Sequence, residues 1–289
     1  MRPLQWFAAL FALVFLAGHA LAAPTRFTVE VSGKGPDVIL IPGLASSADV
    51  LRPTAKRLAA NHRVHLIQVA GFAGAPVAGN GGEGPVVAPL AEEIAAYITA
   101  SKLTAPAVIG HSMGAETGLM LAERHPALVG RLLAVDALPF FPLVMNPAAT
   151  VETVAPQAAL FRDRMAAATP GQWAAMQTAG MARYIKTEAA RPGPIREAVA
   201  SDKSVVARAA YELMTTDLRP DLARVTVPVT VLYAYDPVYG VGAEVIDALY
   251  AGAYAGTAKL TLKRIDGSFH FIMLDQPAAF DAAVDAFLK

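Results

Sequence analysis

Short apolar runs of strand length alternate along this chain with longer segments of helical periodicity. The early runs are nearly continuous in Val, Ile and Leu, as is typical of strands buried on both faces of a parallel sheet. Alternation of this kind predicts an α/β fold with a mostly parallel, doubly wound sheet. The expected strands span residues 26–31, 37–41, 63–69, 105–110, 131–136, 227–235 and 258–265, and the expected helices 48–60, 86–101, 113–124, 243–251 and 277–288.

One long segment, residues 138–224, interrupts the alternation. It contains no convincing strand, only Ala- and Met-rich sequence of helical character with several prolines. A segment this long is more than a loop, so we expect a helical cap over the C-terminal edge of the sheet, with the core formed by residues 23–137 and 225–289. Its methionines are compatible with ordinary core packing or with a pliable apolar wall of an acyl pocket. These are Met145, Met165, Met176, Met181 and Met214.

The first 22 residues differ from the rest. Arg2 precedes an apolar block at residues 4–16, and residues 20–22 (Ala-Leu-Ala) place small side chains at the two positions that a signal peptidase reads. An apolar block this short is typical of a signal peptide, with an uncleaved N-terminal anchor as the alternative. We therefore expect an exported protein, periplasmic or extracellular, with no membrane span after signal removal. The chain has no cysteine, which excludes disulfides, thiol catalysis and thiolate metal sites.

The charge balance and one glycine-rich loop bear on other kinds of ligand. With 24 basic and 24 acidic residues, the chain lacks the basic excess that binding to nucleic acid requires. Residues 79–84 match G-x-G-x-x-G, but nine residues separate them from the end of the preceding expected strand. A dinucleotide site needs these glycines directly after the strand, so a flexible loop is the better interpretation. The chain has no H-E-x-x-H sequence, and we expect no metal and no cofactor.

The candidate nucleophile is Ser112, in the G-x-S-x-G sequence of residues 110–114. The motif directly follows an expected buried strand and opens an expected helix, which is the setting of a nucleophile elbow. Side chains at Gly110 or Gly114 would collide with neighbouring backbone in so sharp a turn. The alternative is a serine that only caps the helix.

The candidate general base is His270. A serine hydroxyl needs an adjacent base, and His270 is the one histidine of six that lies well downstream of Ser112, in a loop after the last expected strand. Two aspartates, Asp136 and Asp236, follow expected strands and would face the same edge of the sheet. The order Ser, Asp, His is satisfied by both, so both are candidates for the acid that orients the imidazole.

An oxyanion hole is expected from two backbone N–H groups. One belongs to Met113, directly after the nucleophile, and the other to Leu44, in the loop after the strand at residues 37–41. The dipole of the helix that begins at Met113 would add positive potential at the same place. Pro42 and Gly43 can also be interpreted as an ordinary turn.

These residues resemble the α/β-hydrolase superfamily over nearly all of the chain after residue 22. The resemblance rests on residues 42–43, the motif at residues 110–114, Asp236, and residues 269–277, which are similar to the histidine loop of capped lipase- and esterase-like members. It implies the α/β-hydrolase fold and favours Asp236 over Asp136 as the triad acid. Many relatives have His-Gly where this chain has Pro-Gly. The expected oxyanion donors are backbone N–H groups, so this difference does not remove the oxyanion hole.

The candidate residues predict a serine hydrolase that cleaves carboxylic esters through an acyl intermediate on Ser112. Phe140, Phe141 and Met145 suggest a pocket for an apolar acyl or aromatic group, and His111, which adjoins the nucleophile, completes the expected substrate-binding set. The expected partner is a small-molecule acyl substrate.

Two alternatives remain open at the level of sequence. A lactonase, thioesterase or amidase could use the same triad, because the fold alone does not name the substrate. A non-catalytic binding protein of the same fold is a further possibility, although every expected triad position is filled. A serine nucleophile argues against dehalogenases and epoxide hydrolases of this fold, which use an aspartate. The sequence makes no prediction of oligomeric state.

Overall fold

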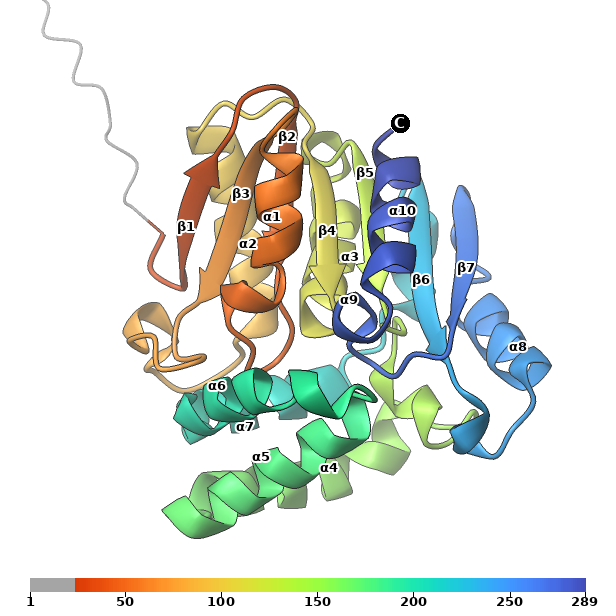
Figure 1. Cartoon of the computed structure of the whole chain (residues 1–289). Coiled ribbons are helices and arrows are strands. Elements are labelled where there is room, and N and C mark those ends of the chain that lie inside the picture. The colour runs from red at the N-terminus through yellow and green to blue at the C-terminus, as the bar shows by residue number, and fades with distance from the viewer. Residues whose placement is uncertain (1–23) are drawn as a thin grey trace, which may run out of the picture.

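The computed structural model describes residues 24–289 and contains one seven-stranded sheet (Figure 1). Its strand order is β1-β3-β2-β4-β5-β6-β7, and every neighbouring pair is parallel except β1 and β3. The expected α/β class and mostly parallel sheet are confirmed. The strands are β1 (Phe27–Ser32), β2 (Asp37–Ile41), β3 (Arg63–Val69), β4 (Ala107–His111), β5 (Arg131–Val135), β6 (Val229–Tyr235) and β7 (Leu260–Asp266).

Helices cover both faces of the sheet. In Figure 1, α1 and α10 lie in front of the strands, and α2 and α3 lie behind them. The central strands β2, β4 and β5 are almost entirely buried as a result, whereas Ile265 is the one buried residue of the edge strand β7. The helices outside the segment between β5 and β6 are α1 (Arg52–Leu58), α2 (Val87–Ala100), α3 (Met113–Arg124), α8 (Ala243–Ala253), α9 (Ile272–Asp275) and α10 (Pro277–Leu288).

Several element boundaries differ from the sequence prediction by one or two residues, and the largest difference is at residues 48–60. The single helix expected at residues 48–60 is a 3-10 turn, η1 (Ala48–Val50), followed by α1. Pro53 lies in the first turn of α1, where its missing N–H costs no helical hydrogen bond, and so marks a new helix start. The glycine-rich loop contains only the short turn η2 (Ala78–Asn80), and the Asn80 amide donates to the Ala70 carbonyl at 3.0 Å.

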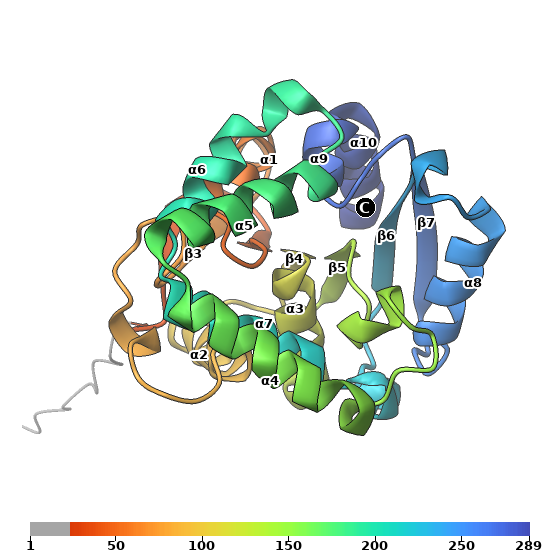
Figure 2. The same ribbon diagram turned by 90° about the horizontal axis from the view of Figure 1, so that it is seen from below.

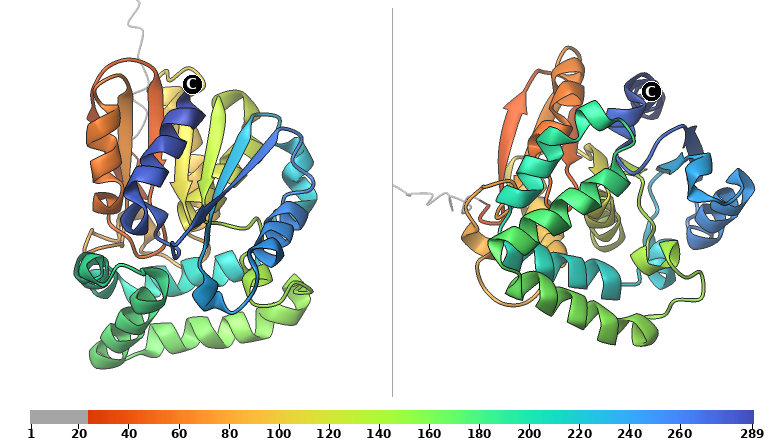
Figure 3. Two further views of the ribbon diagram at one scale, coloured as in Figure 1. Left: turned by 45° about the vertical axis from the view of Figure 1, so that its right-hand side comes forward. Right: turned by 60° about the horizontal axis from the view of Figure 1, so that its bottom comes forward.

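The segment between β5 and β6, residues 138–224, is called the helical insertion below. Within the described chain it contains four α-helices and no strand. It lies beyond the carboxyl ends of the parallel strands, and Figures 2 and 3 show its helices grouped there. Thr150 and Thr169 form capping boxes that start the first two helices. The elements are η4 (Phe141–Val144), α4 (Val151–Ala167), α5 (Pro170–Tyr184), η5 (Glu188–Ala190), α6 (Pro192–Ala200), α7 (Lys203–Thr215) and η6 (Arg219–Arg224).

A buried carboxylate joins the helical insertion to the core. Glu212 of α7 accepts hydrogen bonds from the backbone N–H groups of Val86, Val87 and Ala88, at 2.6, 2.7 and 2.7 Å. These are the N–H groups at the start of α2, which have no partner within the helix. The negative charge also faces the positive end of the helix dipole, so the contact anchors α7 on the core.

A second carboxyl, Glu116 of α3, carries a pH-dependent cost to stability. Glu116 is 3% exposed, and its Oε2 atom has no hydrogen-bond partner among residues 24–289. Burial, reinforced by the negative charge of Glu212, raises the pKa of Glu116 well above its usual value. In the unfolded chain the Glu116 carboxyl ionises once the pH exceeds its usual pKa, whereas in the folded protein it stays protonated to higher pH. The free energy of unfolding therefore falls as the pH rises.

We therefore expect Glu116→Gln to gain in free energy of unfolding relative to the wild-type protein as the pH rises above about 4.5. Urea unfolding at a series of pH values measures this difference. Glu188→Gln, at an exposed position, serves as the control and is expected to show no such trend. A difference between Glu116→Gln and wild type that stays constant from pH 4 to 8 would contradict the interpretation.

The expected signal peptide, residues 1–22, lies outside the described residues. None of the helices found in residues 24–289 is both long and apolar enough to cross a membrane.

Candidate active site

Ser112 occupies a strained turn between β4 and α3. Its backbone angles are φ 52° and ψ −120°, outside the regions that a residue with a side chain normally adopts. A β-carbon at Gly110 would lie 2.2 Å from the Gly114 carbonyl oxygen, and one at Gly114 would lie 2.2 Å from the Ile41 carbonyl oxygen. Only glycine fits at either position. The geometry is that of the elbow expected from the sequence.

Strand register places Asp136 beside this turn. β4 and β5 are adjacent, and their last residues, His111 and Val135, pair with each other. Ser112 and Asp136 directly follow these two strand ends. The Ser112 N–H donates to the Val135 carbonyl at 2.9 Å. Asp136 also has a positive φ of 48°, in the left-handed region that aspartate tolerates better than most residues. The serine and this carboxylate therefore leave the sheet at the same level.

His270 is bonded to Asp136. Its Nδ1 atom lies 2.7 Å from Asp136 Oδ2. Because an ionised carboxylate can only accept, Nδ1 carries the proton and Nε2 is left as the acceptor of the neutral ring. The other oxygen, Oδ1, accepts from the Ala234 N–H at 2.8 Å and from the Tyr250 hydroxyl at 3.2 Å. Burial raises the pKa of Tyr250 well above its usual value, which keeps this hydroxyl a donor.

Asp236, the acid favoured by the sequence, does not contact His270, and this preference requires correction. Its Oδ2 atom accepts from Lys186 Nζ at 2.5 Å, and its Oδ1 accepts from the Val238 N–H at 3.0 Å. The Lys186 ammonium holds the pKa of the Asp236 carboxyl below its usual value. The structure brings together His270 and the alternative acid, Asp136.

The physical reason is the length of β6. Val135 pairs with Leu232, so Asp136 lies one residue beyond this pair and Asp236 lies four residues beyond it. At a rise of about 3.3 Å per residue, Asp236 is displaced by about 10 Å along the strand direction. Both aspartates follow strands, as the sequence indicated, but they leave the sheet at different levels.

His111 lies beneath the histidine loop. It is 1% exposed, and its Nε2 lies 3.1 Å from the His270 carbonyl oxygen. Burial and the neighbouring His270 lower the pKa of His111 well below its usual value, so the ring is neutral. A carbonyl only accepts, so the proton is on Nε2. The prediction that His111 binds substrate finds no support in this contact, which instead joins the elbow to the histidine loop.

The loop after β2 touches the elbow. A β-carbon at Gly43 would lie 3.2 Å from Ser112 Cβ and 3.0 Å from His111 Nδ1. Leu44 follows directly and is half-buried. Met113 is the first residue of α3, and its N–H is among the groups that no acceptor within the helix can satisfy. The two expected oxyanion donors therefore belong to segments that meet at the nucleophile.

Comparison with known sequences identifies the family. A family described as alpha/beta hydrolase fold matches residues 36–277, which is well over half of the chain. The chain belongs to the alpha/beta hydrolase fold family. In this chain the residues of the candidate site are Ser112 at the elbow, His270 after the last strand and Asp136 directly after β5.

Named relatives are esterases and other hydrolases. The pimeloyl-[acyl-carrier protein] methyl ester esterase of Aeromonas hydrophila subsp. hydrophila is 34% identical over 115 residues, which are 39% of this chain and 42% of the esterase. This chain thus matches less than half the length of that relative. The enol-lactonase from Burkholderia xenovorans superposes with a TM-score of 0.71 at 20% identity, covering 91% of this chain and 96% of the lactonase. A thermophilic esterase from Thermogutta terrifontis gives a TM-score of 0.73 at 17% identity, covering 91% and 92%. These two structures show likeness in fold.

The three residues expected to line an acyl pocket, Phe140, Phe141 and Met145, differ in burial in this alpha/beta hydrolase. Phe140 is completely buried in the core, with the Arg219 guanidinium 5.1 Å from its ring centroid. Phe141 is half-buried, and Met145 is 62% exposed at the end of η4. Phe140 thus packs as a core residue. The structure does not bring Phe140, Phe141 and Met145 together as one wall of a pocket. Of the insertion's methionines, Met165 and Met181 belong to the core, as ordinary packing predicts.

Three residues near the site were not identified from the sequence. Tyr250 orients Asp136, Lys186 neutralises Asp236, and Asp275 bonds the histidine loop to the helical insertion. Each contact joins segments far apart in the chain. Tyr250 and Lys186 lie outside the motifs found in the sequence, and Asp275 lies within residues 269–277, where no role was predicted for it.

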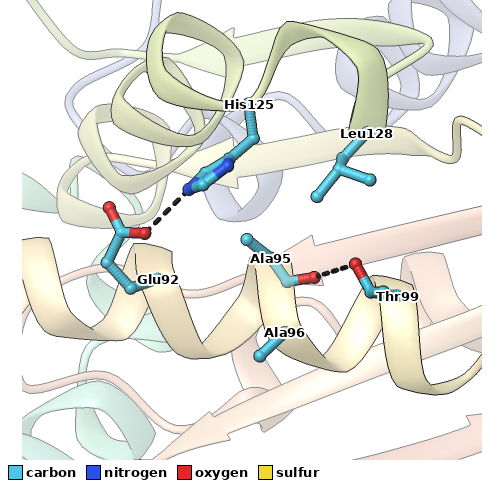
Figure 4. Close-up of a pocket in the computed structure, with 6 residues that line it drawn as sticks. All are labelled: Glu92, Ala95, Ala96, Thr99, His125 and Leu128. Carbon is cyan, nitrogen blue, oxygen red and sulfur yellow. Dashed lines mark hydrogen bonds and ion pairs between the residues drawn. The ribbon is translucent and has the colours of Figure 1, made fainter.

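A surface groove elsewhere on the molecule has no connection with this site. It has a volume of about 370 Å³ and lies between α2 and the turn η3 (Pro126–Leu128), where His125 Nε2 is 2.7 Å from a Glu92 carboxylate oxygen (Figure 4). His125 follows the last residue of α3, whereas Ser112 precedes the first, so the length of that helix, about 18 Å, separates them. Among residues 24–289, no cluster of His, Asp or Glu side chains is arranged to hold a metal ion.

Proposed function

We propose that this protein is a serine hydrolase that cleaves carboxylic ester bonds with Ser112, His270 and Asp136. The observation that supports it is the 2.7 Å contact between His270 Nδ1 and Asp136 Oδ2. Asp136 directly follows β5, beside the elbow serine that directly follows β4, and His270 lies in the loop after β7. This contact fixes the tautomer in which Nε2 can accept a proton. Asp236 takes no part in this triad.

The reaction follows from these groups. His270 Nε2 accepts the proton of the Ser112 hydroxyl as its oxygen attacks the ester carbonyl, and the N–H groups of Met113 and Leu44 stabilise the oxyanion. The protonated imidazole then gives its proton to the departing alcohol, which leaves an acyl-serine. Water that loses a proton to His270 releases the carboxylic acid. Asp136 stabilises the imidazolium in both steps.

The helical insertion forms the cap in this proposal, because it lies over the strand ends that carry Ser112 and Asp136. The apolar substrate group remains part of the proposal, through Phe141 and the exposed Met145. The Aeromonas relative is named as a methyl ester esterase, which is consistent with an ester substrate for this chain.

Hydrolysis of p-nitrophenyl esters from acetate to palmitate tests the proposal. Ser112→Ala is expected to lower kcat by about 10⁴-fold or more, because without the nucleophile only the oxyanion donors and binding remain. Ser101→Ala, at the end of α2, is the control and is expected to retain full activity. The chain length of the best substrate reports the size of the acyl pocket.

Three outcomes would contradict the proposal. Equal turnover by Ser112→Ala and wild type would exclude Ser112 as nucleophile. A folded wild-type protein that hydrolyses none of the esters, yet is labelled at Ser112 by an organophosphonate, would transfer the assignment to lactones, thioesters or amides. Absence of both turnover and labelling would indicate a binding protein.

A further inference from the structure

The residues on both sides of His270 are hydrogen-bonded, one directly to the helical insertion and the other to Asp275. On one side, the Phe271 N–H donates to the carbonyl of Tyr184, the last residue of α5, at 3.1 Å. On the other side, the Phe269 N–H donates to Asp275 Oδ2 at 2.9 Å. The two residues that flank His270 are therefore each held by a separate hydrogen bond.

Asp275 also holds the insertion. Its carboxylate accepts from the backbone N–H groups of Lys186 at 3.0 Å and Thr187 at 2.8 Å. Asp275 is the last residue of the short helix α9, five residues after His270. One carboxylate thus bonds the chain just after α5 to the residue just before His270.

Further contacts strengthen the same junction. The Tyr184 ring lies 5.2 Å from the His270 ring, centroid to centroid, and the Lys186 ammonium reaches Asp236 at the end of β6. Residues 184–187 therefore contact the histidine loop through a carbonyl, two N–H groups and a ring, and they reach the end of β6 through an ammonium. Among the described residues, no other part of the insertion contacts His270 or the residues that flank it in this way.

We propose that Asp275 is a positioning residue for His270. The inference rests on the proposed function, since it assigns His270 as the base. Three N–H donors converge on one anion, and such charge-assisted hydrogen bonds are stronger than neutral ones. They fix the backbone on one side of His270 relative to the insertion, while the Tyr184 carbonyl fixes the other. A base displaced by about 1 Å can cost about 100-fold in rate.

The carboxylate is needed for this role, not merely a polar side chain. A carboxylate has two oxygens that only accept hydrogen bonds, whereas the amide of asparagine has one acceptor oxygen and an NH₂ group that only donates. In Asp275→Asn the NH₂ group would face at least one of the three backbone donors. The Lys186 and Thr187 bonds use different oxygens, so the amide cannot reproduce both.

The test compares full-length wild type, Asp275→Asn, Asp275→Glu and the control Asp281→Asn. Asp281 lies on α10, eleven residues after His270, and pairs with Arg57. We expect Asp275→Asn to lower kcat by about 10- to 100-fold with KM changed less than about threefold. Asp275→Glu, which keeps the carboxylate, is expected to lose less, and Asp281→Asn to match wild type. Thermal melts establish that each variant is folded at the assay temperature.

A second readout does not depend on turnover. Proton NMR of the His270 Nδ1–H that is bonded to Asp136 reports the position of the ring directly. We expect this resonance to shift or broaden in Asp275→Asn and to remain in Asp281→Asn. A purely structural role for Asp275 would lower the melting temperature and leave both kcat per folded molecule and this resonance unchanged, which would overturn the proposal.

The two readouts separate the two proposals. If wild type hydrolyses esters through Ser112 but Asp275→Asn changes neither kcat nor the resonance, the positioning role fails and the proposed function stands. If wild type hydrolyses no ester but the resonance is lost in Asp275→Asn, the proposed function fails while the positioning role stands. If Asp275→Asn does not fold, Asp275→Ala, which also removes the carboxylate, supplies the comparison, and wild-type kcat and resonance in that variant would overturn the positioning role.

Discussion

Replacement of Asp136 by Asn is expected to lower kcat/KM for an ester substrate by about 10⁴-fold, while Asp236→Asn lowers it by about tenfold or less. Asp136 accepts from His270 Nδ1 at 2.7 Å, and an amide in its place can stabilise the wrong imidazole tautomer. Asp236 bonds to Lys186 and to the Val238 N–H, so its replacement affects these two contacts and not the one that orients His270. Steady-state kinetics of the two variants with one p-nitrophenyl ester make the comparison.

The control for both variants is Asp247→Asn on α8, a partly exposed carboxylate that pairs with Arg264. It is expected to keep wild-type kcat/KM. If Asp236→Asn were the more damaging of the two replacements, His270 would have to bond to Asp236 during catalysis, and the assignment of Asp136 as triad acid would be wrong.

Gly114→Ala is expected to destabilise the protein by about 3 kcal/mol or more and to abolish activity. The added carbon would lie 2.2 Å from the Ile41 carbonyl oxygen and 2.7 Å from that of Pro42. These are backbone atoms, so no side-chain rotation can relieve the contact. Relief requires the loop that carries Leu44 to move away from Ser112. Urea unfolding gives the change in free energy.

Gly252→Ala on α8 is the matched control. A β-carbon at Gly252 would meet no atom within 4 Å, and alanine is favoured over glycine within a helix by about 1 kcal/mol. This variant is therefore expected to be as stable as wild type or slightly more stable. Equal stability of Gly114→Ala and Gly252→Ala would show that the elbow is not packed as the structure describes.

Much of the fold follows from local signals in the sequence. The strand at Asp37–Ile41 and the helix at Met113–Arg124 have the bounds that the apolar pattern predicts, because burial on both faces of a sheet requires continuous apolar runs. The elbow at Ser112 is equally local, since its two glycines and its position between a strand and a helix lie within a few residues.

The partner of His270 could not be obtained in this way. Asp136 and Asp236 both follow buried strands, and only the pairing of Val135 with Leu232 shows that one lies level with the elbow and the other beyond it. Apolar pattern determines that a segment is a strand, but not how far it extends past its neighbour. Tertiary structure decides the register.

The same distinction explains the residues that the sequence did not reveal. The bonds of His270 and Tyr250 to Asp136 join residues 134 and 114 positions apart. Those of Asp275 join the histidine loop to a segment nearly 90 positions earlier. The sequence by itself determined the strands, the helices and the nucleophilic turn, because these depend on neighbouring residues. Only the packed structure decided which carboxylate orients the base and which holds its loop, because such contacts exist only once distant segments are brought together.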